Sequence, residues 1–305
     1  MTAPTASRST AFYRGRFAPS PTGPLHFGSL AAALGSYLDA RAHRGEWLLR
    51  MEDLDPPREQ LGAADAILHT LERFGLHWDG SVLYQHTRHA TYQTAIDQLL
   101  ATGAAFPCAC TRSEIADSGI MGIEGPVYPG TCRNGLAGRP ARAIRVRVNS
   151  DPVNFEDRLQ GPCSQNLEQE IGDFVIRRAD GYFAYQLAVA VDDAFQGITH
   201  AVRGCDLLLS TPRQIHLQRR LGLPTPIYMH LPVALNAQGE KLSKQTGAEP
   251  VNDAVPGPLL FEALTFLRQS PPQELHGAAP DELLNWAVQH WQPAQMAGIR
   301  TQTIG

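Results

Sequence analysis

Two short segments, far apart in the chain, carry residue types suited to binding a phosphorylated ligand. The first, RFAPSPTGPLHFGSL at residues 16–30, places His26 and Gly28 where an expected strand gives way to a helix. The free N–H groups at a helix start attract anions, and glycine lets the backbone approach a ligand closely. A histidine there can donate a hydrogen bond to a phosphate oxygen. Alone, this turn does not establish a phosphate site, because a histidine in such a loop usually has no chemical role.

The second segment, EKLSKQTG at residues 240–247, places Lys241 and Lys244 on either side of Ser243. It follows an apolar run, HLPVALN at residues 230–236. Two mobile ammonium groups around a small hydroxyl can neutralise the charge that develops on a migrating triphosphate. A lone KLSK sequence is most simply a solvated loop, but the two segments together favour a site for ATP.

A third set of residues is suited to holding a metal ion. Cys108 and Cys110 precede Tyr128 and Cys132 within a turn-rich part of the sequence. Thiolates at this spacing can share a tetrahedral Zn²⁺, which would stabilise a segment too short for its own core. Three cysteines leave one coordination position, for which the Tyr128 oxygen is an uncommon candidate. The spacing alone leaves a zinc site and ordinary cysteines about equally open.

The elements that must position these residues alternate between strand and helix in the first part of the chain. Apolar spacing and turn residues predict a strand at 12–18, a helix from Gly28, a strand within 46–55, and helices at 63–76 and 91–103. This alternation is typical of a doubly wound parallel sheet, in which ligands bind at the carboxyl ends of the strands.

The pattern changes after residue 104, where turns, cysteines and short β-like runs replace the alternation, and it resumes after Gly181. We therefore predict four parts. They are the first half of a Rossmann-like catalytic domain at 1–104 with a flexible lead-in, an inserted zinc-binding subdomain at 105–180, the second catalytic half at 181–235, and the KLSKQ loop with a short helical region at 236–305.

Composition narrows the class of protein. The 305 residues are 43% hydrophobic and 18% charged, as in an ordinary globular protein. The sequence shows no membrane-spanning stretch or signal peptide, and five cysteines without a secretory signal argue against a disulfide framework. We expect a cytoplasmic monomer that does not bind membranes. A net charge of −4 argues against wholesale capture of nucleic acid, although five arginines within residues 132–148 could form a local basic face.

The sequence resembles the class I aminoacyl-tRNA synthetases of the glutamyl type. Residues 16–30 resemble the first signature of that family, and KLSKQ resembles the second. The resemblance continues through LLRMEDLDPPRE, YQLAVAVDD, GITHAVRGCDLL and STPRQIHLQ. Two departures are small: Ser29 stands where a second histidine often stands, and Gln245 ends the second signature. Neither removes the histidine or the two lysines of the signatures.

The resemblance implies the Rossmann-like doubly wound fold of that class and ATP-dependent activation of L-glutamate, with Mg²⁺ accompanying ATP. It assigns glutamate binding to Arg16, Phe17, Ala18, Pro19, Ser20, Glu52, Tyr185 and Arg203, ATP binding to His26, Gly28, Ser29 and Lys244, and catalysis to His26, Lys241 and Lys244. Arg16 would bind the side-chain carboxylate and Glu52 the α-ammonium. The chemistry agrees, since a guanidinium can grip a carboxylate through two hydrogen bonds.

The segment after Gln245 is too short for the large anticodon-reading region of full glutamyl-tRNA synthetases. The whole chain therefore resembles the shortened glutamyl-Q tRNA(Asp) synthetase family. That family activates glutamate without tRNA and attaches it to queuosine at the first anticodon position of tRNA(Asp), so the RNA would enter by its anticodon arm. The family also carries the C-x-C…Y-x-x-x-C arrangement, which implies one structural Zn²⁺ held by Cys108, Cys110, Tyr128 and Cys132.

Three alternatives remain open at this point. A truncated glutamyl-tRNA synthetase would charge the 3′ end of tRNA(Glu), but the short C-terminal region counts against it. A non-catalytic RNA-binding paralogue would have no physical reason to retain Arg16, His26, Glu52 and Lys244. An ATP-dependent ligase of the same fold could use a small-molecule acceptor, although the zinc-bearing insertion and the arginine-rich segment favour RNA.

Overall fold

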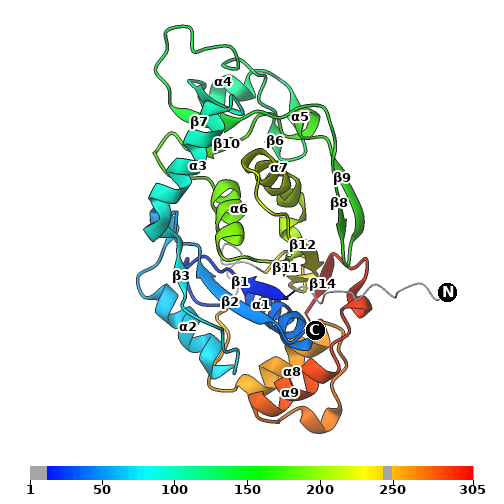
Figure 1. The fold of residues 1–305 in the computed structure, drawn as a ribbon. Helices are drawn as coiled ribbons and strands as arrows, with labels where there is room; N and C mark the ends of the chain where they lie inside the picture. Colours follow the sequence, from blue (N-terminus) through cyan, green and yellow to red (C-terminus); the bar gives the residue numbers. More distant parts are fainter. Residues whose placement is uncertain (1–11, 243–248, 305) are drawn as a thin grey trace, which may run out of the picture.

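The computed structural model describes residues 12–242 and 249–304, so Ser243, Lys244 and Gln245 lie outside the described residues. The chain forms an α/β body with the turn-rich segment at one end and the last two helices at the other (Figure 1). The cavity described below lies in the α/β body.

The first part of the chain folds as the alternation predicts. Its elements are β1 (Arg14–Phe17), α1 (Phe27–Ala42), β2 (Glu46–Met51), the 3₁₀ turn η1 (Pro56–Arg58), α2 (Ala63–Arg73), β3 (Leu83–Tyr84), η2 (Gln85–Arg88) and α3 (His89–Ala101). β1 pairs with β2, and β2 with β3, in parallel. The expectation of a parallel sheet is confirmed.

The segment after residue 181 supplies a further parallel pair. Its elements are α6 (Tyr185–Phe195), β11 (His200–Gly204), η3 (Cys205–Ser210), α7 (Thr211–Leu221), β12 (Ile227–Leu231) and β13 (Val233–Leu235). β11 and β12 are parallel, and the N–H of Thr199 donates to the carbonyl of Arg14 at 2.9 Å. This contact sets the start of β11 beside β1, so that both strands end near the same cavity.

Helix α1 packs unusually close to β12. A Cβ atom on Gly35 would lie 2.5 Å from a methyl carbon of Leu231, so any larger residue would require the buried Leu231 side chain to shift. The inward side chains Leu30, Leu34 and Leu38 are fully buried. Helix α1 is therefore a central element of the core rather than a surface helix.

The turn-rich segment contains its own small sheet. Its elements are β4 (Ala105–Cys108), α4 (Arg112–Ala116), β5 (Met121–Gly122), β6 (Gly125–Pro126), β7 (Ala143–Val146), β8 (Val153–Asp157), β9 (Gly161–Gln165), α5 (Leu167–Glu170) and β10 (Val175–Arg177). β7 lies between β10 and β4 in antiparallel order. The β8–β9 hairpin instead joins β12. The division of the chain at residues 105 and 180 stays a prediction.

The C-terminal elements close the core on the far side of α1. They are α8 (Pro256–Phe266), η5 (Gln273–Leu275), α9 (Pro280–Gln289), η6 (Pro293–Met296) and β14 (Thr301–Thr303). Both helices share one hydrophobic cluster with α1, and β14 pairs with β13 in parallel. Among the described residues, no helix combines the length and apolar character needed to cross a membrane.

Candidate functional site

A cavity of about 470 Å³ opens beside the ends of β1, β2 and β11. It brings together twelve of the thirteen residues that the sequence assigned to glutamate, ATP or catalysis; Lys244 lies outside the described residues. These lining residues are Arg16, Phe17, Ala18, Pro19, Ser20, His26, Gly28, Ser29, Glu52, Tyr185, Arg203 and Lys241. His26 of the first signature segment and Lys241 of the second, more than two hundred residues apart in sequence, therefore line one cavity.

His26 occupies the N-cap of α1, where the helix N–H groups lack partners within the helix. Its Nδ1 accepts a hydrogen bond from the N–H of Ser29 at 3.3 Å, and its Nε2 lies 3.0 Å from the Ser29 hydroxyl. A Cβ atom on Gly28 would lie 3.2 Å from the imidazole ring, so the glycine leaves room for the ring in this position. Ser29, the departure from the signature, thus fixes the histidine.

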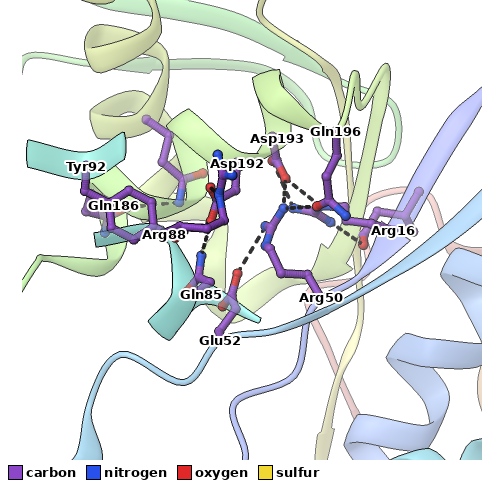
Figure 2. A network of polar contacts seen from close by, with 12 residues as sticks. Arg16, Arg50, Glu52, Gln85, Arg88, Tyr92, Gln186, Asp192, Asp193 and Gln196 are labelled. Atoms are coloured by element: carbon purple, nitrogen blue, oxygen red, sulfur yellow. Dashed lines mark hydrogen bonds and ion pairs between the residues drawn. The ribbon is translucent and has the colours of Figure 1, made fainter. Parts of the chain in front are cut away.

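Arg16 is hydrogen-bonded to the buried carboxylate of Asp193. Its Nε and Nη2 donate to the two oxygens of Asp193 at 3.1 and 3.3 Å, and its Nη1 donates to the carbonyl of Val202 at 3.3 Å (Figure 2). A guanidinium has five N–H donors, so two have no hydrogen-bond partner among the residues that the structure describes. Burial by itself would raise the pKa of Asp193, but Arg16 and Arg50 hold it at about 2. Asp193 is therefore a fixed negative charge.

Arg50 connects Asp193 to Glu52. It is fully buried, and its Nη1 donates to Asp193 and to the Gln196 amide oxygen at 2.8 Å each, while its Nη2 donates to Glu52 at 3.1 Å (Figure 2). Burial raises the pKa of Glu52, and the neighbouring Arg50 and Arg16 oppose that shift only in part. An additional cation beside Glu52 would therefore stabilise its carboxylate.

Tyr185 begins helix α6 and contributes a phenol to the cavity. Burial, together with the charge of Glu52, raises the pKa of Tyr185 to about 12. The phenol consequently keeps its proton at neutral pH and can donate a hydrogen bond.

Arg203, on β11, is 6% exposed. Its Nε donates to Nε2 of His230 at 3.0 Å, and its Nη2 donates to the Thr211 hydroxyl at 2.8 Å. Its Nη1 is buried and has no hydrogen-bond partner among the described residues.

Lys241 brings the second signature segment to the other end of the cavity. Its ammonium donates to Asp206 at 2.7 Å, and the two side chains are 49% and 34% exposed. Asp206 also lines the cavity but was not singled out from the sequence. This ion pair is far more solvated than those around Asp193.

The sequence analysis gave no role to Arg50, Asp193, His230 or Asp206. The first two lie inside stretches quoted for their family resemblance, LLRMEDLDPPRE and YQLAVAVDD. The available signal was an ionisable residue within an otherwise apolar run, because such residues are rarely buried without a partner.

The three cysteines predicted as metal ligands lie together, away from the cavity. The sulfurs of Cys108, Cys110 and Cys132 all lie within 4.8 Å of one another, and those of Cys110 and Cys132 are 3.6 Å apart. The Tyr128 hydroxyl is 3.5 Å from the Cys108 sulfur and 4.0 Å from the Cys110 sulfur. Sulfurs bound tetrahedrally to Zn²⁺ at about 2.3 Å lie roughly 3.8 Å apart, so this donor set fits the ion.

The arginine-rich segment is largely paired within the protein. Arg133 binds Asp173 at 2.6 Å, and Arg145 donates to the Asp173 carbonyl at 2.6 Å and lies 4.1 Å over the Tyr128 ring. Arg139 pairs with Glu114 at 2.8 Å. The local basic face suggested by the sequence is therefore mostly used in holding the turn-rich segment together.

Comparison with known proteins agrees with this geometry. Residues 13–255 match the family model described as tRNA synthetases class I (E and Q), catalytic domain. A relative from Aromatoleum aromaticum named glutamyl-Q tRNA(Asp) synthetase is 59% identical over 280 residues, which cover 92% of this chain and 89% of the relative. One of the same name from Chromobacterium violaceum is 57% identical over 284 residues, covering 93% and 95%.

Solved structures give the same fold. A glutamate tRNA ligase from Elizabethkingia meningosepticum, in complex with its amino acid, is 26% identical with a TM-score of 0.77, covering 96% of this chain and 67% of that one. The glutamate-tRNA synthetase of Elizabethkingia anophelis, 24% identical with a TM-score of 0.78 and covering 96% and 68%, supports the fold alone. The chain therefore belongs to the glutamyl-Q tRNA(Asp) synthetase family of class I tRNA synthetases, which are ATP-dependent ligases.

Proposed function

We propose that this ligase activates L-glutamate with ATP, without needing tRNA for that step, and transfers the glutamyl group to queuosine at the first anticodon position of tRNA(Asp). The observation that carries the proposal is the single cavity shared by the candidate glutamate residues and the signature segments. The name of the relatives, at 54–60% identity, supports the acceptor.

Glutamate selection follows from the fixed charges. The two N–H donors that Arg16 has left can bind the side-chain carboxylate of glutamate as a pair. The α-ammonium adds a second cation beside Glu52, which already pairs with Arg50, while Tyr185 and Arg203 complete the pocket. Glutamine has no negative charge for Arg16, so it is disfavoured. Phe17, Ala18, Pro19 and Ser20 line the same cavity.

ATP would occupy the part of the cavity lined by His26, Gly28 and Ser29, at the N-terminus of α1, where the helix dipole favours an anion. An oxygen of the glutamate α-carboxylate attacks the α-phosphorus, and pyrophosphate leaves with its electron pair. His26, Lys241 and Lys244 stabilise the charge on the phosphates as this bond breaks. Mg²⁺ accompanies ATP as part of the substrate.

One structural Zn²⁺, held by Cys108, Cys110, Tyr128 and Cys132, is the second element of the proposal. Its support is the clustering of the three sulfurs and the phenol oxygen. The ion cross-links a core of only a few buried residues and takes no part in the reaction. Purified protein should contain about one zinc per chain. Cys132→Ser should lose it and Cys163→Ser should keep it; equal zinc in both variants would contradict the site.

The remaining expectations concern the partner and the assembly. Entry of the RNA by its anticodon arm, the monomeric state and the cytoplasmic location stay predictions. Light scattering of the purified chain, alone and with tRNA, would measure its oligomeric state directly.

The experiment that tests the proposal is transfer of labelled glutamate to purified tRNAs. Queuosine-containing tRNA(Asp) should be labelled, whereas tRNA(Asp) without queuosine and tRNA(Glu) should not. Label on tRNA(Glu) would instead favour a minimal glutamyl-tRNA synthetase. Glutamate-dependent release of pyrophosphate without label on any tRNA would favour a small-molecule acceptor, and neither activity would favour the non-catalytic paralogue.

A further inference from the structure

Two of the three nitrogens of the Arg203 guanidinium are hydrogen-bonded within the protein. Its Nε and Nη2 donate to His230 and Thr211, whereas its Nη1 is buried without a partner among the described residues. A buried donor left unpaired is destabilising, so a ligand acceptor at Nη1 would be favourable. Because Arg203 lines the cavity, the orientation of its guanidinium decides where that donor is presented.

His230, at the fourth position of β12, determines this orientation. The ring is fully buried, and its Nδ1 lies 2.6 Å from an oxygen of Asp157. A carboxylate only accepts hydrogen bonds, so Nδ1 carries the proton; an arginine Nε only donates, so Nε2 presents its lone pair. The two neighbours together require one neutral tautomer of His230.

Asp157 is in turn fixed where β8 ends. Its Oδ1 accepts hydrogen bonds from the backbone N–H groups of Leu159 at 3.0 Å and Gln160 at 2.9 Å. Burial by itself would raise the pKa of Asp157, but the bonds from His230 and these N–H groups hold it below its usual value. The carboxylate therefore stays ionised and keeps the proton of His230 on Nδ1.

The surroundings of His230 oppose its protonation. Arg203 faces it from β11, Asp157 from β8 and Asp206 from η3, and the Tyr228 ring is stacked at 6.1 Å. Burial lowers the pKa of His230 to about 4; Arg203 adds to the shift, while the two carboxylates oppose it. A proton on Nε2 would point at the N–H of Arg203 and break that hydrogen bond.

We propose that Asp157 and His230 are positioning residues that aim the unpaired Nη1 of Arg203 at a carboxylate oxygen of bound glutamate. Neither residue lines the cavity, so both act only through Arg203. The inference rests on the proposed glutamate-binding role of Arg203. It also gives the β8–β9 hairpin, whose sequence lies within the predicted insertion, a part in substrate recognition.

The test uses two substitutions of His230 that retain different halves of the ring. His230→Gln can keep an acceptor near Nε2, whereas His230→Asn can keep only the donor toward Asp157. In tRNA-free ATP–pyrophosphate exchange, His230→Asn should raise the glutamate KM about tenfold and change the ATP KM less than about twofold. His230→Gln should recover at least about threefold of that loss. Equal glutamate KM values in the two folded variants would overturn the proposal.

Asp157→Asn provides a second route that does not alter the ring. Its amide N–H would donate to Nδ1 and shift the proton to Nε2, so the glutamate KM should again rise about tenfold with a near-normal ATP KM. A merely structural role would lower the melting temperature and leave both KM values near those of the wild type.

Arg203→Lys separates this inference from the proposed function beneath it. If Arg203→Lys leaves the glutamate KM unchanged, Arg203 does not bind glutamate, and both statements fail. If Arg203→Lys raises that KM while His230→Asn and Asp157→Asn do not, the pocket stands and the positioning role alone is overturned.

Discussion

The two ends of the cavity differ in how their charges are held. At the glutamate end, Arg50 and Asp193 pair beneath the surface, and their side chains are 0% and 3% exposed. At the ATP end, Lys241 and Asp206 pair with side chains that are 49% and 34% exposed. Buried charges are oriented before the substrate arrives, whereas a solvated pair contributes little and is easily exchanged. Under the proposed function, this difference would build selectivity for glutamate into the fold and let the phosphate contacts form on binding.

The largest expected effect comes from removing the charge at the centre of the glutamate end. Asp193→Ala leaves Arg16 and Arg50 buried without their shared carboxylate, so we expect the free energy of unfolding to fall by about 3–5 kcal/mol. Urea denaturation measures this. The control is Asp180→Ala, which removes an exposed pair with Arg178 and should cost less than about 1 kcal/mol. Similar losses in the two variants would contradict the contrast between buried and exposed charge.

At the ATP end, we expect a substitution to lower the rate of ATP–pyrophosphate exchange and to leave the stability of the fold unchanged. Lys244→Ala should lower kcat for ATP–pyrophosphate exchange by about 10²–10³ without changing the unfolding midpoint, because its ammonium acts on developing charge. Unchanged exchange would remove the assigned role of that lysine.

A chemical experiment gives a check without mutation. Lys241 and Lys244 are the only lysines in the sequence, so a lysine-directed acylating reagent modifies only this segment and the N-terminus. ATP should protect both side chains from the reagent, whereas glutamate alone should not. Equal protection of the two lysines by ATP and by glutamate would contradict the proposed difference between the glutamate end and the ATP end of the cavity.

The buried histidine behind the glutamate end should make stability depend on pH. The pKa of His230 is lowered from 6.5 to about 4, so the unfolded chain takes up its proton more readily than the folded chain. Stability should be complete above pH 6.5 and fall as the pH drops toward 4, by at most roughly 1.4 kcal/mol per pH unit. His230→Gln should flatten this slope in urea titrations at pH 7 and pH 5, and an unchanged slope would assign it to other groups.

The smallest effect should come from Ser29. Ser29→Ala removes the hydroxyl partner of His26 but keeps the backbone N–H bond, so we expect about a tenfold loss in exchange rate with the glutamate KM unchanged. A rise in glutamate KM instead would mean that the two ends are not independent.

The sequence was informative wherever short-range patterns determine structure. The alternation of strand and helix predicted the parallel strands, and the signature segments predicted the residues that line the cavity. The pairing of Arg50 with Asp193 joins residues 143 positions apart, and that of Asp157 with His230 joins residues 73 apart. Such pairs leave no periodic signal, so HLPVALN predicted only an apolar strand and gave no role to its histidine.

The arginine-rich segment is a second case in which partners distant in the sequence could not be predicted. Its charges suggested a basic face, but Arg133 and Arg139 pair with Asp173 and Glu114, which are distant in the sequence. The β8–β9 hairpin likewise lies within the predicted insertion but pairs with β12, because strand pairing depends on the three-dimensional arrangement.

The central claim is that one cavity selects glutamate through fixed buried charge and activates it with ATP. The most direct measurement is ATP–pyrophosphate exchange by the purified chain without tRNA, comparing glutamate with glutamine. We predict exchange that depends on glutamate and is at least about 10²-fold weaker with glutamine, which lacks the charge that Arg16 pairs with. Equal exchange with both amino acids, or none with glutamate, would contradict the account.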